Sequence, residues 1–498
     1  MKPTEATTLS EFVQSLGEAY GDRPAFVFDD ESISFQEIEE RSALVARGLL
    51  GRGVGKGSRI GLLFSNNIEW VISWAAIVRM GAVAIPLSTF SQPPELARVV
   101  RHADLQGLLA QRGFLKHDFV SSLEAAFPEL VDGSSTDLRL RGAPFLRWIA
   151  FTGDAELPSW AHDYGWVLEG AARGVDDEFL RLVQDTVHRD EPAMFILTSG
   201  TSAEPKAVMH SQGGIAAKTH YIRDMLGFTQ DSKNAATLPF FWVGGLIMTL
   251  FPTLEIGGTV VSSAAPPGQR QTMSSNDPAV LNSYPGLKKR IGLGMSETFG
   301  MFSWGDDEPT DKYPAITPLA EFEPGYRIKV VDDDGEQVDV GMIGELLIKG
   351  PTVTLGLHKV DADKSFDRDG FYRTGDLCEQ GLGVLYFVGR KGDMIKTSGT
   401  NVAPAEVERE LRELDGVQHA FVVDLDDEQR GSIVAAAVVL AEGNSLNAES
   451  ITEILSSRLS SYKVPRVIVF VEAAELPYTP SNKIIKRDLQ ALVASRRS

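Results

Sequence analysis

Cysteine is almost absent from this chain of 498 residues, which contains a single thiol, Cys378. One thiol excludes an internal disulfide and fits a reducing compartment, so we expect a cytoplasmic protein. Basic residues are scarce relative to acidic ones, 48 against 68. The resulting net charge of −20 argues against a nucleic-acid-binding or anionic-membrane-binding surface, and we expect no nucleic-acid partner.

Long hydrophobic runs are missing as well. The most apolar region, residues 240–261, is interrupted by Pro252, Glu255 and four glycines, which is typical of a buried core segment. The first ten residues are polar, include Glu5 and lack an apolar stretch after a basic start. We therefore expect neither a signal peptide nor a transmembrane segment.

The pattern of the N-terminal half predicts an α/β fold. With 43% hydrophobic residues, a chain of this length can bury more than one core, so at least two domains are expected. A capping box at Ser34-Phe35-Gln36-Glu37 predicts a helix that ends at the glycines from position 51 onward. Predicted strands at 59–64 and 82–87 flank a predicted helix at 68–80. Such alternation predicts mostly parallel sheets flanked by helices.

The C-terminal half has shorter predicted elements. Short strands between 326 and 349, separated by the turn Asp332-Asp333-Asp334-Gly335, predict a small β-rich subdomain. We predict a boundary that leaves a large N-terminal domain, 1–389, and a smaller α+β domain, 390–498. In the smaller domain, the patterns predict helices at 404–414 and 451–459 and strands at 417–423, 433–440 and 467–471.

A polar loop follows the apolar run 194–197 and has the sequence Thr198-Ser199-Gly200-Thr201-Ser202-Ala203-Glu204-Pro205-Lys206. Its hydroxyls, its backbone N–H groups and its lysine suit phosphate oxygens. The spacing is not that of a Walker loop. Taken alone, the segment is equally compatible with an ordinary Ser/Thr/Gly surface loop.

Together with later stretches, this loop resembles the acyl-adenylate-forming superfamily, which includes acyl-CoA synthetases, peptide-synthetase adenylation domains and luciferases. The other matching stretches follow in the family's order across most of the chain. They are Pro239-Phe240-Phe241-Trp242-Val243-Gly244-Gly245, Gly294-Met295-Ser296-Glu297-Thr298, Tyr372-Arg373-Thr374-Gly375-Asp376-Leu377, Gly389-Arg390 continuing to Lys396-Thr397-Ser398-Gly399, and Pro477-Tyr478-Thr479-Pro480-Ser481-Asn482-Lys483-Ile484.

The resemblance implies an ATP site whose residues are spread along the chain. It assigns catalytic roles to Lys483, Glu297 and Thr198. Lys483 would bridge the carboxylate, the ribose and the α-phosphate, which suits a compact ammonium with three donors. Without its flanking motif, it would be an ordinary solvated lysine. The implied ATP and AMP contacts are Thr198, Ser199, Gly200, Thr201, Lys206, Ser296, Asp376, Arg390 and Lys483.

Two implied roles belong to carboxylates. Glu297 stands at the family's metal position and would contact Mg²⁺ as a hard oxygen ligand. Asp376 would accept hydrogen bonds from the ribose diol, and Arg390 would reach the ribose or the phosphates. Taken alone, Glu297 is more typical of a helix N-terminal acid and Asp376 of an ordinary turn acid, whereas Arg390 is equally compatible with a surface arginine.

The acyl, CoA and hinge sites are also implied by the resemblance. Tryptophan at position 242, where relatives often have histidine, predicts a tunnel for a hydrophobic acid, although aromatic clusters beside a sheet are usually core. Gly392 would be the hinge of a mobile C-terminal domain, because glycine absorbs large backbone rotations. The implied acyl pocket is Phe240, Phe241, Trp242, Gly244 and Gly245, and the implied CoA contacts are Lys396, Ser398 and Gly399.

Segment 262–293 is shorter than its counterpart in the family. Ser263-Ala264-Ala265-Pro266-Pro267 is either a remnant of the loop that packs against adenine or a linker. Leu293 stands where relatives commonly have an aromatic residue that stacks on adenine. We therefore predict weak ATP binding and poor discrimination between ATP and GTP.

The motifs together predict an ATP-dependent ligase that activates a hydrophobic carboxylic acid, fatty or alicyclic, as acyl-AMP and transfers it to CoA. ATP, Mg²⁺ and CoA are the implied cofactors and co-substrates. One alternative is an adenylating enzyme that loads a carrier protein in trans. Another is a pseudo-enzyme or binding protein with an impaired nucleotide site. The acid and the oligomeric state stay open, with a homodimer as one arrangement.

Overall fold

The chain folds into two compact units in a computed structural model. The first contains Met1–Asp306, Phe322–Arg327 and Lys349–Tyr372, and the second contains Asp307–Glu321, Ile328–Ile348 and Arg373–Ser498. Among the described residues, no helix has both the length and the hydropathy that a membrane crossing requires. The structure describes all residues except 134, 154–155, 199–204, 265–291, 305–314, 392–394, 398–399, 403, 428–430, 445, 460–462, 479–483 and 498.

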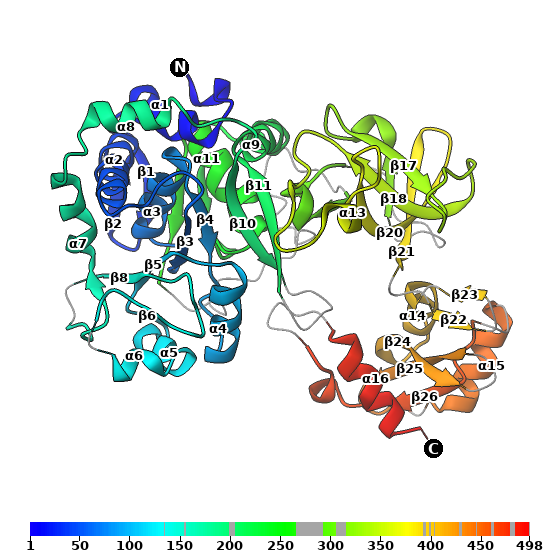
Figure 1. Cartoon of the computed structure of the whole chain (residues 1–498). Helices are drawn as coiled ribbons and strands as arrows, with labels where there is room; N and C mark the ends of the chain where they lie inside the picture. The colour runs from blue at the N-terminus through cyan, green and yellow to red at the C-terminus, as the bar shows by residue number, and fades with distance from the viewer. Residues whose placement is uncertain are drawn as a thin grey trace. The chain divides into compact units, whose positions relative to one another are not determined.

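An eight-stranded sheet forms the centre of the first unit (Figure 1). Its strands from β10 to β9 are parallel. At one edge, β11 pairs antiparallel with β10, and β19 pairs antiparallel with β11. This arrangement confirms the predicted mostly parallel α/β fold. In sheet order, the strands are β19 (Gly356–Leu357), β11 (Lys206–Ser211), β10 (Pro192–Thr198), β4 (Val83–Pro86), β3 (Arg59–Leu63), β5 (Gly107–Gln111), β8 (Trp148–Thr152) and β9 (His162–Asp163).

Smaller sheets complete the strands of the first unit. The largest has four strands, in the order β12 (Lys233–Ala235), β13 (Thr259–Ser262), β1 (Pro24–Phe28) and β2 (Glu31–Ser34). Two-stranded sheets pair β6 (Gly113–Phe114) with β7 (His117–Asp118), and β14 (Gly294–Met295) with β15 (Gly300–Met301).

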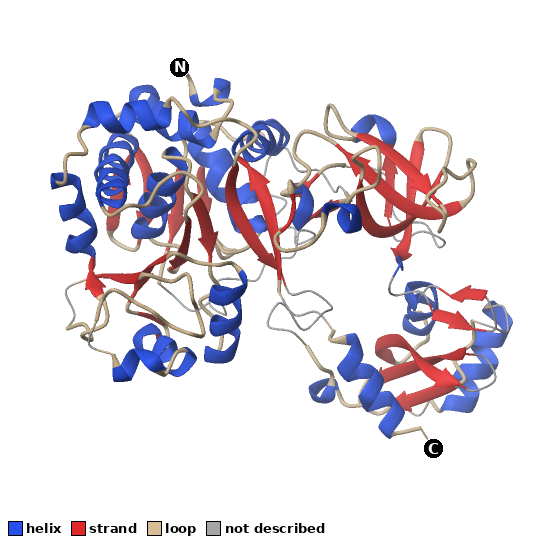
Figure 2. Ribbon diagram, viewed as in Figure 1, coloured by secondary structure: helices blue, strands red, loops and turns tan. Residues whose placement is uncertain are grey.

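Helices cover these sheets, as Figure 2 shows. Helix α3 lies between β1 and β3, and nearly every residue in it is buried, as expected of a helix that is apolar all round. The helices are α1 (Leu9–Tyr20), α2 (Phe35–Gly51), α3 (Ile68–Arg79), α4 (Pro93–His102), α5 (Phe119–Ala126), α6 (Glu129–Asp132), α7 (Tyr164–Glu169), α8 (Asp177–Gln184), α9 (Gln212–Leu226), α10 (Val243–Gly245), α11 (Phe251–Glu255) and α13 (Ala362–Ser365).

Local sequence signals fix several of these elements. At the start of α2, the Ser34 hydroxyl accepts a hydrogen bond from the backbone N–H of Glu37, 3.1 Å away, and the Glu37 carboxylate accepts one from the backbone N–H of Ser34, 2.8 Å away. The predicted capping box is therefore confirmed. The predicted helix at 68–80 and the strands at 59–64 and 82–87 are also present, shortened by one or two residues.

In the described part of the second unit there are two five-stranded sheets and three α-helices. The first sheet has the order β16 (Ala315–Pro318), β21 (Val384–Arg390), β20 (Tyr372–Gln380), β18 (Ile343–Lys349) and β17 (Arg327–Val331). Its predicted turn is present, because the Asp332 carboxylate accepts from the backbone N–H groups of Asp334 and Glu336, each 3.0 Å away, and Gly335 has a φ of 86°. The predicted β-rich subdomain corresponds to this sheet.

The remaining elements of the second unit form the α+β module. Alternate residues of β25 point to opposite faces, so Val434 packs with α14 and α15, whereas Ile433 packs with α16. The predicted boundary at residue 390 stays a prediction. The module consists of β22 (Ile395–Thr397), β23 (Thr400–Val402), β24 (Val417–Asp427), β25 (Gly431–Leu440), β26 (Val467–Phe470), α14 (Pro404–Arg412), α15 (Ala448–Arg458) and α16 (Lys486–Ser495).

Candidate functional site

The two ends of the predicted phosphate loop lie on neighbouring strands of the large sheet. Thr198 ends β10, Lys206 begins β11, and the two residues pair across the antiparallel ladder. The segment between them therefore connects the arms of a hairpin, and the Lys206 side chain is exposed. The predicted contacts Ser199, Gly200 and Thr201 lie outside the described residues.

Glu297 lies in a tight hairpin. Strand β14 leads into a single 3₁₀ turn, Ser296–Thr298, and β15 returns antiparallel to β14. The buried Thr298 hydroxyl links the two strands of the hairpin. It donates to the carbonyl of Gly300, 2.6 Å away, and accepts from the backbone N–H of Met295, 3.3 Å away. As a result, Ser296 and the Glu297 side chain are both left partly exposed.

The Glu297 residue is held from two directions. The Tyr372 hydroxyl donates to Glu297 Oε1 over 3.3 Å, and the backbone N–H of Thr354 donates to the Glu297 carbonyl over 2.7 Å. No cluster of three or more metal-ligating side chains occurs in the described ranges. One partly exposed carboxylate nevertheless fits Mg²⁺, because this ion is usually held by one or two carboxylates together with substrate phosphates.

His210 was not predicted as a site residue, yet it touches this hairpin. Its side chain projects from β11, is 2% exposed, and packs edge to face on Phe299 with ring centroids 4.8 Å apart. Burial lowers the pKa of His210 to about 3, although a hydrogen bond to the Ser296 backbone opposes this shift. His210 is therefore neutral at ordinary pH.

A buried ion pair contacts β15, the strand that follows the Glu297 turn. Lys218 of α9 is 0% exposed and Glu323 is 3% exposed. Lys218 Nζ donates to the Glu323 carboxylate and, over 2.8 Å, to the carbonyl of Met301. The Thr352 hydroxyl donates to the same carboxylate over 3.1 Å. Burial lowers the pKa of Lys218 to about 8, against the opposing effect of Glu323. Sequence reasoning missed this pair because its members are 105 positions apart.

The predicted acyl-pocket residues differ in their surroundings. Phe240 is 1% exposed and lies in the core between Trp70 and Phe26, with ring centroids 5.1 and 6.1 Å away. Phe241 is also buried and packs edge to face on Phe90, whereas Trp242 is only half-buried. Trp242 is therefore the aromatic member of this set with surface left for a ligand.

The loop that carries these residues is held by Asn66. The Asn66 carboxamide accepts from the backbone N–H of Phe240 over 2.9 Å and donates to the carbonyl of Leu238 over 2.8 Å. Glycine is required at position 245, since a Cβ there would lie 2.3 Å from the Pro239 carbonyl oxygen. Gly245 thus allows a close approach of backbone to backbone.

The aromatic residues after Glu297 are core residues. Phe299 and Trp304 belong to the main core of the first unit. Phe302 is buried and stacks on Tyr326 with ring centroids 5.5 Å apart. They do not extend the surface that Trp242 exposes.

In the second unit, the predicted ribose residues face each other. Asp376 of β20 and Arg390 of β21 are register partners, and Arg390 Nε lies 2.7 Å from Asp376 Oδ1. The Asp376 side chain is 11% exposed and that of Arg390 is 49% exposed. The backbone N–H of Asp376 also donates to the Thr374 hydroxyl, 3.0 Å away. The pair is therefore largely buried at its carboxylate end and accessible at its guanidinium end.

Of the remaining predicted residues, Lys396 alone belongs to the described part of the chain. Lys396 lies on β22, where it pairs with Asn401. Gly392, Ser398, Gly399 and Lys483 lie outside the described residues. For these positions, the hinge, CoA and catalytic roles stay predictions.

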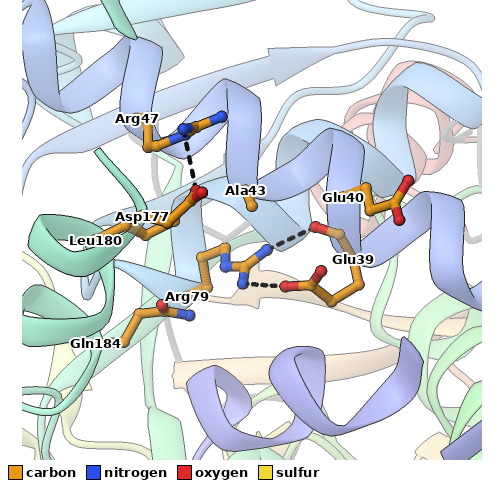
Figure 3. Close-up of a pocket in the computed structure, with 8 residues that line it drawn as sticks. All are labelled: Glu39, Glu40, Ala43, Arg47, Arg79, Asp177, Leu180 and Gln184. Carbon is orange, nitrogen blue, oxygen red and sulfur yellow. Dashed lines mark hydrogen bonds and ion pairs between the residues drawn. The ribbon is translucent and has the colours of Figure 1, made fainter. Parts of the chain in front are cut away.

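A polar pocket between α2, α3 and α8 contains none of the predicted site residues (Figure 3). Arg79 Nη2 is 2.7 Å from Glu39 Oε1, and Arg47 Nη1 is 3.0 Å from Asp177 Oδ1. Opposite charges thus already pair with one another across this pocket, which indicates helix packing rather than ligand binding. Its lining residues are Glu39, Glu40, Ala43, Arg47, Arg79, Asp177, Leu180 and Gln184.

Two family models match this chain. The AMP-binding enzyme model matches residues 13–291 and 281–358, and the AMP-binding enzyme C-terminal domain model matches residues 406–483. The first match is broken into two pieces that meet at 281–291, which lies within the segment predicted to be shortened.

Two relatives illustrate matches that extend over most of both chains. Indoleacetate–CoA ligase of Aromatoleum aromaticum is 27% identical over 531 residues, covering 98% of this chain and 98% of the relative. The mitochondrial medium-chain acyl-CoA ligase ACSF2 of Danio rerio is 26% identical, covering 98% and 88%. With the two AMP-binding domains, these similarities support an AMP-forming acid–CoA ligase that uses ATP and CoA.

Solved structures show the same fold. ATP-bound MatB from Rhodopseudomonas palustris superposes with a TM-score of 0.76 at 22% identity, over 99% of this chain and 100% of that chain. A benzoate CoA ligase from Burkholderia xenovorans LB400 gives 0.72 at 21% identity, over 97% and 99%. From the family models and the motifs in both units, we conclude that this chain belongs to the AMP-binding enzyme family, within the acyl-adenylate-forming superfamily.

Proposed function

We propose that this chain activates a hydrophobic carboxylic acid, fatty or alicyclic, as its acyl-AMP and transfers the acyl group to CoA. The observation that carries the proposal is the placement of Glu297, whose partly exposed carboxylate is oriented by Tyr372 on a hairpin anchored to β11, the strand that begins with Lys206. Lys206, which would contact phosphate, and Glu297, which would hold the metal, thus both belong to segments tied to β11 in the first unit.

Two half-reactions follow from this proposal. In the first, the acid carboxylate attacks the α-phosphorus of ATP, the bond from that phosphorus to the pyrophosphate oxygen breaks, and acyl-AMP forms. In the second, the CoA sulfur attacks the acyl carbonyl carbon, the bond to the AMP oxygen breaks, and the thiol proton is released. A bound Mg²⁺ would neutralise phosphate charge in the first half-reaction.

The chain's own residues would divide this work among them. Thr198 and Lys206 would contact the phosphates, and Glu297 would hold the metal. Asp376 and Arg390 would bind the ribose, for which an acceptor carboxylate and a half-exposed guanidinium are suited. Lys483 would bridge the reacting groups, Gly392 would be the hinge, and Lys396, Ser398 and Gly399 would contact CoA.

The hydrophobic character of the acid rests on Trp242. It is large and half-buried, and beside it Phe241 packs on Phe90. Such a surface favours apolar contact with a hydrocarbon chain or ring over recognition of a charged acid.

An acid panel in a pyrophosphate-exchange assay tests the proposal. Aliphatic, alicyclic and aromatic acids are supplied with ATP and Mg²⁺, and exchange is expected to be fastest with aliphatic or alicyclic acids. Adding CoA should then produce AMP and thioester in equal amounts. Fastest exchange with a small charged acid would contradict the proposed substrate class, and exchange without thioester would favour a carrier protein as acceptor.

A second candidate is a binding protein with an impaired nucleotide site. The observation in its favour is the broken family match at 281–291, together with Leu293 at the adenine position. Losing an aromatic stacking partner costs about 1–3 kcal/mol in single-stranded nucleic-acid sites. Calorimetry with ATP, GTP and Mg²⁺ distinguishes the readings, because the enzyme should bind ATP detectably, whereas the binding protein should bind neither nucleotide at millimolar concentration.

A further inference from the structure

Glu345 is a buried carboxylate to which the proposed reaction gives no task. It lies on β18, next to β20 in the sheet, and its side chain is 6% exposed. Lys391 Nζ donates to Glu345 Oε2 over 3.1 Å, and Arg373 Nη1 lies 3.7 Å from the same oxygen. Arg373 stands three positions before Asp376, and Lys391 directly follows Arg390. Both segments that carry the proposed ribose residues therefore contact this one carboxylate.

The other oxygen of Glu345 holds the backbone just before Asp376. Glu345 Oε1 accepts a hydrogen bond from the backbone N–H of Gly375 over 3.3 Å. Gly375 has a φ of 70°, in the left-handed region, so the chain departs from extended geometry at this point. Glu345 thus contacts the turn from which the Asp376 side chain projects.

Neighbouring hydrogen bonds join this turn to β18 and to Arg390. The Thr374 hydroxyl donates to the carbonyl of Leu346 over 2.6 Å and accepts from the backbone N–H of Asp376 over 3.0 Å. Arg390 Nη1 donates to the Thr374 carbonyl over 3.3 Å, while its Nε lies 2.7 Å from Asp376 Oδ1. The Leu346 bond uses only the backbone of β18, whereas the bonds of Glu345 depend on its side chain.

We infer that Glu345 is a positioning residue, which holds Asp376 through Gly375, and Arg390 through Lys391, in the arrangement that receives the ribose of ATP. The inference rests on the part of the proposed function that places the ribose at Asp376 and Arg390. Both oxygens of Glu345 bond to protein donors, so it acts through these two residues and not on the nucleotide itself. Small displacements matter here, because a hydrogen bond weakens steeply as its distance and angle depart from the optimum.

Two substitutions at position 345 grade the loss. Glu345→Met keeps a side chain of similar length and removes both the charge and the acceptors. Glu345→Gln removes the charge but keeps one oxygen for the N–H of Gly375. Asp333→Asn is the matched control, because Asp333 Oδ1 also lies 3.1 Å from Lys391 Nζ but belongs to the exposed turn after β17.

The preference for ATP over 2′-deoxy-ATP and 3′-deoxy-ATP is the readout, measured as dissociation constants by calorimetry and as KM in pyrophosphate exchange. The wild type should prefer ATP, because a carboxylate at the ribose accepts from its hydroxyls. The Met variant should lose about tenfold of this preference through weaker binding of ATP, the scale of one hydrogen bond. The Gln variant should lie between it and the wild type, and the Asp333→Asn control should match the wild type.

A merely structural role would not change this preference. A variant that is partly unfolded loses activity with every nucleotide equally, so the ratio between ATP and its deoxy analogues stays constant. Asp376→Asn supplies the reference for a lost ribose contact. Combining it with Glu345→Met should lower the preference no further than Asp376→Asn alone, because both changes remove the same interaction.

Three results would overturn the inference. They are a wild type without preference for ATP over the deoxy nucleotides, an unchanged preference in the Met variant, and full additivity with Asp376→Asn. The proposed function fails separately, because a wild type that binds ATP with the ribose preference but exchanges no pyrophosphate with any acid would overturn only the ligase activity. In that case, the calorimetric series still tests Glu345.

Discussion

Two ion pairs of this chain have opposite exposure. Lys218 and Glu323, in the first unit, are 0% and 3% exposed, and both are hydrogen-bonded to protein groups. Arg390 and Asp376, in the second unit, combine an 11% exposed carboxylate with a 49% exposed guanidinium. A charge enclosed by its own protein cannot contact a substrate, whereas a half-exposed one can. The difference separates charges that stabilise the fold from charges that are available for ligands.

Removing one partner of the buried pair should have the largest effect. Lys218→Met leaves the Glu323 carboxylate buried without its cation, and should lower the free energy of unfolding by about 3–5 kcal/mol. The double variant Lys218→Met/Glu323→Leu should recover most of this loss, because it removes the uncompensated charge. Denaturant unfolding of both variants measures the effect. A double variant as unstable as the single one would show that packing, not charge, dominates at this position.

The carboxylate of Glu297 provides the matched contrast to Glu323. Glu297→Gln should reduce pyrophosphate exchange by about 10²–10³-fold, the scale of losing one group that stabilises transition-state charge. Its melting temperature should stay near that of the wild type, because the side chain is partly exposed. Exchange kinetics and thermal unfolding are measured on the same preparation. A large loss of stability would place Glu297 with Glu323 among the structural carboxylates.

A third buried carboxylate adds a dependence on pH. Glu255 is fully buried and pairs with His220 and, over 3.0 Å, with Arg223. Burial lowers the pKa of His220, but the hydrogen bond and the charge of Glu255 outweigh it and raise the pKa above its usual 6.5. The folded chain therefore binds this proton more tightly than the unfolded chain does.

The stabilisation by His220 should be complete below about pH 6.5 and should be lost as the pH rises through the raised pKa. His220→Phe should cost about 1.5–3 kcal/mol at pH 6, the scale of a hydrogen bond to a charged group, and less at pH 8. Unfolding curves at the two pH values check this. An equal cost at both would mean that His220 contributes through packing alone.

The sequence predicted local elements better than it predicted partners. The capping box at Ser34 and the helix at 68–80 were predictable, because their signals lie within a few residues of each other. The pairing of Asp376 with Arg390 depends on the register between two strands, and that register cannot be deduced from either sequence motif. The surroundings of His210 could not be predicted from the sequence either, because Phe299 and Ser296 come close to it only in the folded chain.

The smallest effect on stability is expected at the exposed end of the second ion pair. Arg390→Ala should change the free energy of unfolding by about 1 kcal/mol or less, because the guanidinium is half-exposed and its charge is screened by water and salt. If Arg390 binds the ribose or phosphates, the same variant should raise the KM for ATP by about tenfold, which corresponds to about 1.4 kcal/mol.

Arg390→Lys sharpens this test. A lysine keeps the positive charge but lacks the planar fork, so it should restore stability fully and ATP affinity only in part. Urea unfolding and the ATP dependence of pyrophosphate exchange are compared in the wild type, the Ala variant and the Lys variant. An unchanged KM in both variants would show that Arg390 only holds Asp376. In that case, half-exposure of a charged side chain would not be sufficient to predict that it binds a ligand. Asp376 would then be the residue to test next.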